Sequence, residues 1–513
     1  MLKFKTHINN KNKDWITFIH GFGGSSNIWH KQVRDLYKHY NLLFVDLRGH
    51  GKSKSIPLDY DFNLSIICNM KKFLILLLLF PFMIFAQIST YNLEATWSIN
   101  EVQNLYTQNN LPYYIGDINY AVNGYKVSYY TLNEDANLVL VSGVLFLPVN
   151  PSCPSPILSW QHGTIVSDMQ APSQNINDNI LGVVSASHGY VVVVSDYLGL
   201  GEGEGMHNYC HSETEASAVI DLIIEGKNIA TTEGLNISDQ LFLMGYSQGG
   251  HSTMATVKEI ELNYSNIFNI TASCPMAGPY SMSNAQANML DLVYPNPGYF
   301  PYVIFSYQNV YGNLYNNPDE LFMPGFENLF NMYDGSYSMT EINEEIWSIA
   351  EDDYGISQLT FTPLHMIKDS YYQNYLNDAS HPFKLALQDN DLIDFIPQSP
   401  MRLIHCNGDD NVAYENSMLA FNSFSQFSTQ ELVLLDGGNF NHSDCSLPSI
   451  ISAKLFFDEL FDVCDDNTII ELNLDKELVN IVDYLGRNID LTNKYNFCVK
   501  LYSDGSFDKV MKF

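Results

Sequence analysis

Short apolar runs alternate with helix-like stretches along most of the chain, from about residue 88 to residue 463. The apolar runs predict buried strands at residues 156–160, 190–195, 240–244, 401–405 and 431–435. Helices are expected between them at residues 213–230, 248–262 and 447–461. Strands that alternate with helices form a mostly parallel sheet covered on both faces, so the pattern predicts the α/β fold class.

A continuous apolar run breaks this alternation closer to the N-terminus. It covers residues 73–85, follows Met70-Lys71-Lys72 and ends at Ala86-Gln87. A start methionine, a basic segment, a short apolar segment and a small residue are the parts of a secretory signal peptide at residues 70–87. The run is too short to cross a bilayer comfortably, so we expect export and no stable membrane span. Provided that translation effectively starts at Met70, the protein is expected to be secreted or at the cell surface.

Residues 1–69 precede this segment and have a strand pattern of their own. An apolar run at residues 16–19 leads into His20-Gly21-Phe22-Gly23-Gly24, and a run at residues 42–46 leads into Arg48-Gly49-His50-Gly51-Lys52-Ser53. These motifs resemble the start of a cytoplasmic α/β-hydrolase, including its oxyanion loop. No nucleophile elbow, acid or histidine of such an enzyme follows before Met70. We therefore predict a truncated, inert hydrolase fragment, joined to a separate domain by a gene fusion, a frameshift or a mispredicted start.

Charge is distributed unevenly over these parts. Residues 1–69 are net basic, whereas residues 88–513 are strongly acidic, and the whole chain has a formal net charge of −32. With 46% hydrophobic and 16% charged residues, the composition is that of a globular protein rather than a disordered one. An acidic surface repels nucleic acids and anionic lipid headgroups, so we expect neither as a partner.

The strongest chemical signal is Gly-Tyr-Ser-Gln-Gly at residues 245–249, between a predicted strand and a predicted helix. A nucleophile elbow holds its serine in a strained turn, which small flanking residues permit. Gly245 and Gly249 provide that room, so Ser247 is the expected nucleophile. The residue after the nucleophile donates a backbone N–H to the oxyanion hole, which assigns one donor to Gln248.

A serine hydroxyl becomes nucleophilic when a histidine accepts its proton and a carboxylate orients that histidine. Both partners are expected after the serine, with the acid first. Asp409 and Asp410 follow the predicted strand at residues 401–405, and periodicity does not choose between them. His442, the only histidine after Asp409, is the expected base, in a loop after the strand at residues 431–435.

The second oxyanion donor is expected in the loop after the strand at residues 156–160. This loop contains Gln161-His162-Gly163-Thr164, and its flexible His-Gly step makes Gly163 or Thr164 the candidate. We expect His162 itself to be structural rather than catalytic.

Several further motifs make the resemblance of this chain to known hydrolases more specific. They are Asp196-Tyr197-Leu198-Gly199-Leu200-Gly201, His207-x-Tyr209-x-His211-x-Glu213-Thr214-Glu215-Ala216, residues 371–376, Asn377-Asp378-x-x-His381-Pro382, Asn390-Asp391-Leu392 and Val412-x-Tyr414-Glu415-Asn416-Ser417. With them, residues of about 95–462 resemble the exported bacterial relatives of secretory lipases. The resemblance implies an α/β-hydrolase fold, an ester substrate and a triad of Ser247, Asp409 and His442. Asp409 is favoured over Asp410 because the acid of that family stands three residues before a valine.

His207 and His211 stand four residues apart with Cys210 between them. That spacing is compatible with a metal site, but a metal needs another ligand and triad chemistry needs neither a metal nor a cofactor. We therefore expect no metal, no cofactor and a structural loop here.

Cysteine positions suggest one bridge. Cys406 and Cys445 each lie three residues from an expected triad residue. Because an exported chain can form disulfides, we hypothesise a Cys406–Cys445 bridge that braces the acid and base loops.

Two further segments complete the expected organisation. The long interval between Ser247 and Asp409 predicts an inserted helical cap at residues of about 285–395, within a catalytic domain at residues 88–463. Aromatic and aliphatic residues at 299–337 suit either an acyl or aromatic pocket or the cap's own core.

Residues 464–513 follow the catalytic domain and contain predicted strands at 477–483, 484–487 and 499–502. They resemble a shortened sorting domain of type IX secretion. This resemblance implies the type IX machinery as a partner, and a plain β-hairpin appendage is the alternative.

These patterns predict an exported serine hydrolase that cleaves small-molecule or lipid carboxylic esters through an acyl-enzyme. Triad geometry does not separate ester from amide cleavage, so a serine peptidase of the same fold is the nearest alternative. A non-catalytic surface or adhesion protein on a hydrolase scaffold is a second alternative. Loss of a triad residue would favour that reading, and this sequence keeps all three.

Overall fold

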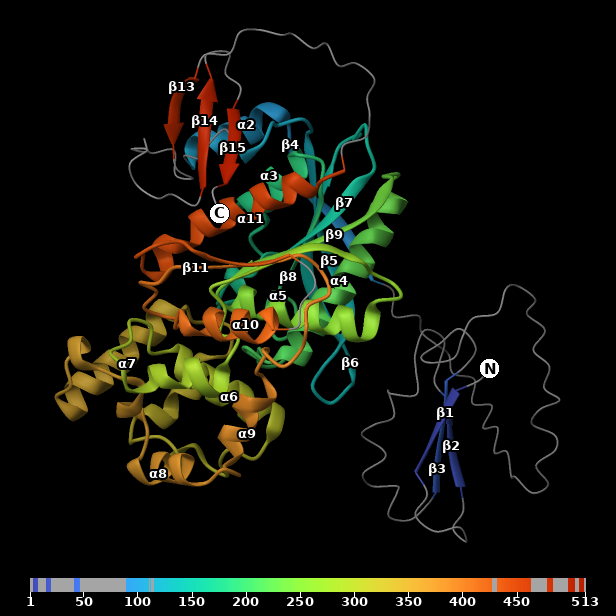
Figure 1. The fold of residues 1–513 in the computed structure, drawn as a ribbon. Coiled ribbons are helices and arrows are strands. Elements are labelled where there is room, and N and C mark those ends of the chain that lie inside the picture. The colour runs from blue at the N-terminus through green and yellow to red at the C-terminus, as the bar shows by residue number, and fades with distance from the viewer. Residues whose placement is uncertain are drawn as a thin grey trace. The chain divides into compact units, whose positions relative to one another are not determined.

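The computed structural model describes residues 3–7, 15–19, 41–46, 89–109, 111, 115–426, 431–462, 478–482, 497–502 and 507–511. The chain divides into two compact units, Met1–Met83 and Ile84–Phe513 (Figure 1). The signal-like segment at residues 70–87 and the glycine-containing loops at residues 20–24 and 48–53 lie outside the described residues. Within the described residues, no helix combines the length and the apolar character that crossing a bilayer requires.

The first unit contains a small three-stranded sheet. Its strands are β1 (Lys3–His7), β2 (Trp15–Ile19) and β3 (Asn41–Asp46), in the order β1-β3-β2. β1 runs antiparallel to β3, and β2 runs parallel to it. In the second unit, β6, β8 and β7 have this same order and the same directions.

The second unit is built on a nine-stranded sheet with the order β12-β11-β10-β9-β7-β8-β6-β5-β4. The strands are β4 (Thr90–Trp97), β5 (Val122–Leu132), β6 (Leu138–Pro148), β7 (Ser155–Gln161), β8 (Val191–Ser195), β9 (Ile237–Tyr246), β10 (Ile270–Met276), β11 (Met401–His405) and β12 (Leu432–Asp436). Neighbours from β12 to β8 are parallel, and those from β8 to β4 are antiparallel. The parallel strands are those that the sequence predicted, apart from β10.

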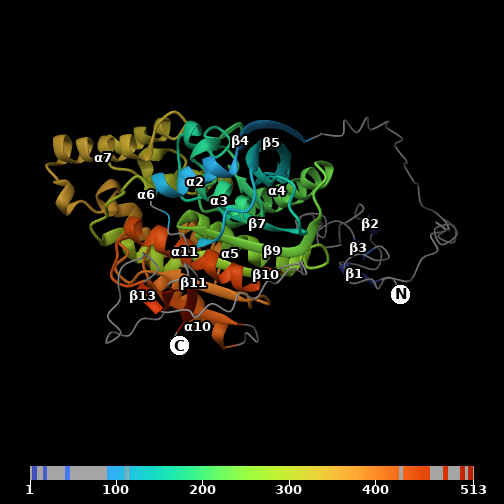
Figure 2. The ribbon, with the colours of Figure 1, turned by 90° about the horizontal axis from the view of Figure 1, so that it is seen from above.

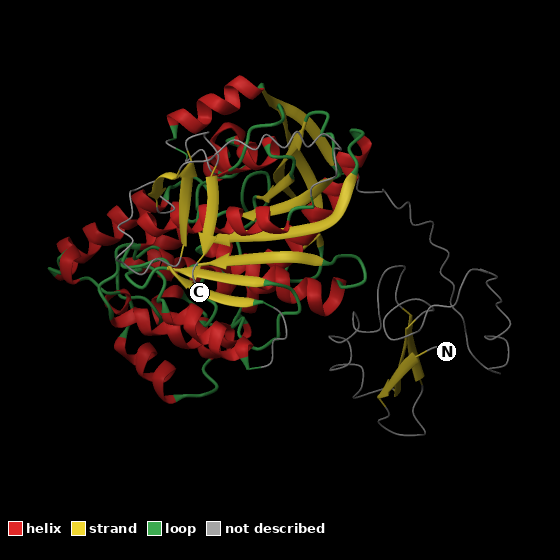
Figure 3. Cartoon of the chain, turned by 45° about the horizontal axis from the view of Figure 1, so that its top comes forward, coloured by secondary structure: helices red, strands yellow, loops and turns green. Residues whose placement is uncertain are grey.

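Helices cover both faces of this sheet (Figure 3). The helices α4 (Ser212–Thr232), α5 (Gln248–Glu259) and α10 (Glu415–Ser425) contribute to one apolar core, and α2 (Ile99–Gln108), α3 (Ile180–Ser187) and α11 (His442–Leu460) contribute to the other. Successive residues of a strand point to opposite faces, so Leu241 and Leu243 of β9 join the first core while Phe242 and Met244 join the second. A strand buried on both faces explains the continuous apolar runs in the sequence.

A cap lies between β10 and β11 in the chain. Its α-helices are α6 (Tyr299–Tyr311), α7 (Met339–Tyr354), α8 (Asp369–Asn377) and α9 (Pro382–Asp389), and Figure 2 shows α6 and α7 at one end of the unit. The boundaries of α7 follow from local chemistry: the Ser338 hydroxyl accepts the backbone N–H of Glu341, and Gly355 ends the helix at a φ of 66°. Aromatic residues such as Phe305, Phe322 and Phe326 form a separate core within the cap.

The C-terminal residues form a third sheet. It consists of β13 (Leu478–Val482), β14 (Phe497–Tyr502) and β15 (Phe507–Met511), which pair antiparallel in that order. The strand predicted at residues 484–487 lies outside the described residues, and β15 was not predicted.

Candidate active site

Ser247 occupies the sharp turn between β9 and α5. β9 ends at Tyr246 and α5 begins at Gln248, so a single residue connects the strand to the helix. The backbone of Ser247 has φ 63° and ψ −122°, values that side-chain-bearing residues rarely adopt. Its N–H donates to the carbonyl of Met276 at the end of β10, at 3.0 Å. The strained turn therefore has the geometry of a nucleophile elbow.

The two glycines of the motif are required by close backbone approach. A Cβ atom on Gly245 would lie 2.2 Å from the carbonyl oxygen of Gly249. A Cβ atom on Gly249 would lie 2.0 Å from the carbonyl oxygen of Gln161, the last residue of β7. Both distances are far below van der Waals contact, so neither position accommodates a side chain.

The structure brings the three predicted triad residues together. The Oγ atom of Ser247 lies 2.8 Å from Nε2 of His442, and Nδ1 of His442 lies 2.6 Å from Oδ2 of Asp409. The side chain of Asp409 is fully buried, and that of His442 is 11% exposed. Asp409 follows β11 and His442 follows β12, so the ends of neighbouring parallel strands position both residues.

The expectation that His442 lies in a loop was wrong. His442 is the first residue of α11, because the Asn441 side chain caps this helix by accepting the backbone N–H of Asp444 at 2.8 Å. The capping asparagine was the sequence signal for this earlier start. Asp410, the other candidate acid, is exposed and accepts the backbone N–H of His442 at 3.2 Å.

The Asp409 carboxylate accepts four hydrogen bonds. Oδ1 accepts the backbone N–H groups of Asn411 at 2.9 Å and Val412 at 2.8 Å, and Oδ2 accepts from His442 and from His405 at 3.2 Å. Burial alone would raise the pKa of Asp409, but the hydrogen bonds from His405 and His442 outweigh it and hold this pKa well below its usual value. His405 was not predicted as a site residue; its position at the end of a predicted strand, four residues before the acid, was the only signal in the sequence.

The predicted oxyanion loop lies against the elbow. A Cβ atom on Gly163 would lie 3.8 Å from Cβ of Ser247, which is ordinary contact. The hydroxyl of Thr164 lies 3.0 Å from that of Tyr209. Gln248 opens α5, where backbone N–H groups have no acceptor within the helix. His162 is half-buried, its Nδ1 lies 2.7 Å from the carbonyl of Gly163, and desolvation of its ring lowers its pKa to about 4.

The side chain of Gln248 belongs to a buried polar network. Its amide nitrogen lies 2.8 Å from Oε1 of Glu215 and 2.6 Å from Nε2 of His207. The second ring nitrogen of His207 lies 2.8 Å from the carbonyl of Leu198, so that nitrogen donates and Nε2 accepts from Gln248.

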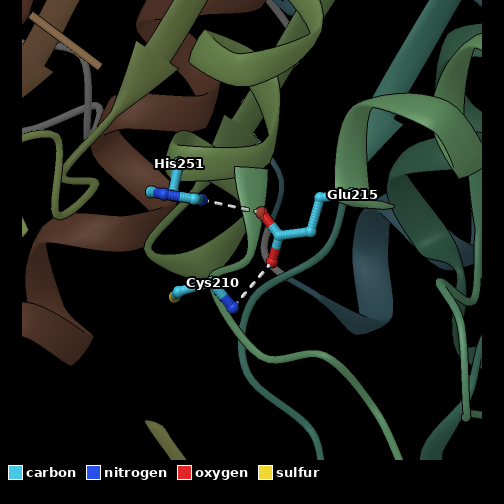
Figure 4. A group of neighbouring side chains, drawn as sticks. All are labelled: Cys210, Glu215 and His251. Atoms are coloured by element: carbon cyan, nitrogen blue, oxygen red, sulfur yellow. Dashed lines mark hydrogen bonds and ion pairs between the residues drawn. The ribbon is translucent and has the colours of Figure 1, made fainter. Parts of the chain in front are cut away.

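Glu215 lies between Cys210 and His251 in this network (Figure 4). Oε1 accepts the backbone N–H of Cys210 at 3.1 Å, and Oε2 lies 2.7 Å from Nδ1 of His251. Donor atoms of these three side chains lie within 4.8 Å of one another, close enough to hold a metal ion. Both carboxylate oxygens of Glu215 accept hydrogen bonds in this arrangement, and Oε1 also accepts from the Gln248 side chain.

A disulfide joins the acid and base segments, as hypothesised. Cys406 directly follows β11, Cys445 lies in the first turn of α11, and their Cα atoms are 6.0 Å apart. Cys153 is also disulfide-bonded, whereas Cys210 and Cys274 are buried free thiols.

An apolar cavity adjoins Ser247. Cap residues form most of its wall, together with Ser247, Gln248 and Val412. The apolar lining includes Met282, Leu290, Phe300, Val303, Phe383 and Leu387. The apolar residues of the cap therefore serve both uses that the sequence left open, the cap's own core and a pocket wall.

Comparisons with known proteins support an α/β-hydrolase fold for this chain. A protein family described as alpha/beta hydrolase fold matches residues 14–113. The rice cell wall degrading esterase LipA from Xanthomonas oryzae is 28% identical; the match covers 72% of this chain and 97% of that chain, with a TM-score of 0.63. Candida antarctica lipase A, at 15% identity and a TM-score of 0.54 over 73% of this chain and 81% of that chain, shares the fold.

Among curated proteins, 2-succinyl-6-hydroxy-2,4-cyclohexadiene-1-carboxylate synthase of Escherichia coli is 38% identical over 55 residues. This match covers 10% of the chain, and the chain spans 21% of that protein. The chain has the α/β-hydrolase fold, and its esterase neighbours support hydrolase activity.

Proposed function

We propose that this protein is a serine esterase that hydrolyses carboxylic esters through a covalent acyl-enzyme. The observation that carries the proposal is the continuous hydrogen-bonded path from Ser247 through His442 to Asp409. These side chains come from three separate segments, yet they meet at the distances that proton transfer requires.

The geometry supports the following sequence of steps. Nε2 of His442 accepts the Ser247 hydroxyl proton while Oγ attacks the ester carbonyl carbon, and the buried Asp409 carboxylate stabilises the imidazolium. The resulting oxyanion is bound by the N–H of Gln248 and by the N–H of Gly163 or Thr164. His442 then protonates the leaving alcohol oxygen as the C–O bond breaks. A water molecule, deprotonated by His442, attacks the acyl carbon; the bond to Oγ of Ser247 then breaks, Oγ takes the proton from His442, and the carboxylic acid is released.

The cavity beside Ser247 favours an ester with an apolar acyl part. The wall of the cavity is mostly aliphatic and aromatic. Binding of an apolar acyl chain there is favourable because it removes apolar surface of both the chain and the wall from water. The structural neighbour LipA is named an esterase, which favours an ester over a peptide bond.

A series of nitrophenyl esters of increasing acyl length tests the proposal. We expect saturable hydrolysis by the wild-type protein and a loss of roughly ten-thousand-fold or more in Ser247→Ala. Ser252→Ala is the matched control, because Ser252 is a buried serine of α5, the helix that directly follows Ser247. Cleavage of a fluorogenic peptide without ester cleavage would instead favour the peptidase alternative.

We also propose that the protein is exported and that the mature chain begins after residue 87. The layout of residues 70–87 supports this, as does the Cys406–Cys445 disulfide, a bond that persists in oxidising compartments. N-terminal sequencing of protein secreted from cells that express the full chain tests it. We expect a start near Ile88; retention of residues 1–87 on the secreted protein contradicts the proposal.

The same expression system tests residues 464–513 as a sorting signal. In a bacterium that has type IX secretion, we expect deletion of these residues to abolish surface delivery and to leave esterase activity intact. Unchanged delivery would identify the segment as a plain β appendage.

A further inference from the structure

Two histidines, rather than one, contact the expected catalytic acid. Oδ2 of Asp409 lies 2.6 Å from Nδ1 of His442 and 3.2 Å from Nε2 of His405. His405 is the last residue of β11, and its side chain is fully buried. The triad mechanism itself uses only the first of these contacts.

The other contacts of His405 determine which ring nitrogen donates. Nε2 also lies 3.1 Å from the carbonyl oxygen of Val412, which can only accept, so Nε2 carries the proton. Nδ1 then accepts from the hydroxyl of Ser417 in α10, at 2.8 Å. A neutral His405 in this tautomer satisfies all three partners at once. Its ring is thereby fixed between β11, the acid loop and α10.

We propose that His405 is a positioning residue, which holds the Asp409 carboxylate toward His442 and limits how strongly that carboxylate attracts the charge on the imidazolium. The proposal rests on the proposed triad. Oδ1 of Asp409 is already held by two backbone N–H groups, so His405 supplies the one side-chain donor to the carboxylate besides His442, among the described contacts. Without it, Oδ2 has a single donor, and the carboxylate can rotate about the Oδ1 anchor.

Loss of the His405 hydrogen bond has a defined electrostatic consequence. A buried carboxylate that loses a donor becomes more basic, because its negative charge is less compensated. A more basic Asp409 attracts the positive charge on the protonated form of His442 more strongly. His442 must be neutral to accept the Ser247 proton, so the acid limb of the pH profile moves to higher pH.

Other titratable groups lie near Asp409 and His442, and we expect none of the tyrosines among them to titrate near neutral pH. Asp410 accepts the backbone N–H of His442. The hydroxyl of Tyr246 donates to the carbonyl of His442 at 2.7 Å, and burial raises the pKa values of Tyr246 and Tyr294. The ring of Tyr414 lies 5.4 Å from that of His405, and burial raises its pKa too. The tyrosines stay neutral, so they do not produce a limb near neutral pH.

The pH dependence of kcat/KM for a nitrophenyl ester tests the proposal on the full-length protein. In His405→Leu we expect the midpoint of the acid limb to rise by roughly half a pH unit or more. Ser417→Ala removes the hydrogen bond to Nδ1 that polarises the His405 ring, so the Nε2–H group becomes a weaker donor to Asp409 and we expect a smaller shift in the same direction. Tyr414→Phe keeps the ring beside His405 and removes a hydroxyl, so its midpoint should equal that of the wild type.

The contrary outcome is an acid limb of the kcat/KM profile that has the same midpoint in His405→Leu, Ser417→Ala and the wild type, with only the melting temperature of the variants lowered. That result would show that His405 is merely structural. If His405→Leu does not fold, an unshifted limb in folded Ser417→Ala overturns the proposal by itself. Failure of the proposed function is distinguishable, because the Ser247→Ala variant would then retain esterase activity.

Discussion

Cys406 and Cys445 form a disulfide between the end of β11 and the first turn of α11. It links the segment that carries Asp409 to the segment that carries His442, and these two side chains lie 2.6 Å apart. The bridge closes a loop with a sequence separation of 39 residues. The distance between acid and base is therefore held covalently as well as by a hydrogen bond.

Removal of this disulfide should lower both stability and activity. For the double variant Cys406→Ala/Cys445→Ala we expect a loss of roughly 2–4 kcal/mol in the free energy of unfolding, measured with urea. We also expect a lower kcat for ester hydrolysis, because the acid and base segments can then separate. Cys274→Ala, which removes a buried free thiol of the same sheet, is the control. Equal stability and kcat in the double variant and the wild type would refute a bracing role.

The two neighbouring aspartates should differ sharply in mutagenesis. Asp409→Asn removes the charge that stabilises the His442 imidazolium, so we expect kcat to fall by roughly ten-thousand-fold. Asp410→Asn changes an exposed carboxylate that accepts from the backbone N–H of His442 and from the Asn411 side chain but does not contact the His442 ring, and we expect kcat within about tenfold of the wild type. A larger loss in Asp410→Asn than in Asp409→Asn would reverse the assignment.

The depressed pKa of Asp409 also predicts how stability depends on pH. The folded-state pKa lies below the unfolded value of about 3.9, so the folded chain binds this proton less readily than the unfolded chain. The ionised carboxylate stabilises the fold above the unfolded pKa, and that contribution is lost as the pH falls through the folded pKa. Thermal unfolding of the wild type and of Asp409→Asn should therefore differ least in strong acid. A difference that stays constant down to low pH contradicts this origin.

Two glycines near the nucleophile should respond oppositely to alanine. Gly249→Ala forces a Cβ to within 2.0 Å of a backbone oxygen, so we expect little soluble, folded protein. Gly163→Ala places its Cβ no closer than 3.5 Å to any neighbour, so we expect a folded protein with a wild-type circular dichroism spectrum. Normal folding of Gly249→Ala would contradict the close approach between the elbow and the end of β7.

Filling the cavity should shorten the preferred acyl chain. Val303 lines the cavity from α6, and Val303→Trp adds an indole to that wall. We expect kcat/KM for long acyl esters to fall by roughly tenfold or more while that for acetate esters is nearly unchanged. Leu376→Trp on α8 is the control, since Leu376 is an exposed cap residue outside the lining. A uniform loss across all chain lengths would argue against an acyl-binding cavity.

The sequence predicted the parallel part of the fold well because its strands are buried on both faces. Val191 to Val194 of β8 form a continuous apolar run that periodicity detects directly. β5 has the mixed pattern of an antiparallel strand with one less buried face, and it was not predicted. β10 was missed although most of its residues are buried, and its single proline weakens the strand signal.

Prediction of the candidate site had a similar limit. Ser247 was predicted from a short motif, and His442 was predicted from the order of the triad residues along the chain. Both signals can be found in the sequence without knowledge of contacts. His405 and Glu215 act through contacts with residues distant along the chain or on other elements, such as Ser417 and Gln248. No local pattern marks such contacts, and a buried histidine at a strand end looks like any other core residue.

The central claim is that Ser247 is a nucleophile activated by His442. Intact-mass measurement after treatment with a fluorophosphonate, which phosphonylates activated serines, tests it most directly. We expect one adduct on the wild-type protein, mapped to the peptide that contains Ser247, one on Ser252→Ala and none on Ser247→Ala or His442→Ala. An adduct that persists in Ser247→Ala, or a wild-type protein that remains unmodified, would contradict the account.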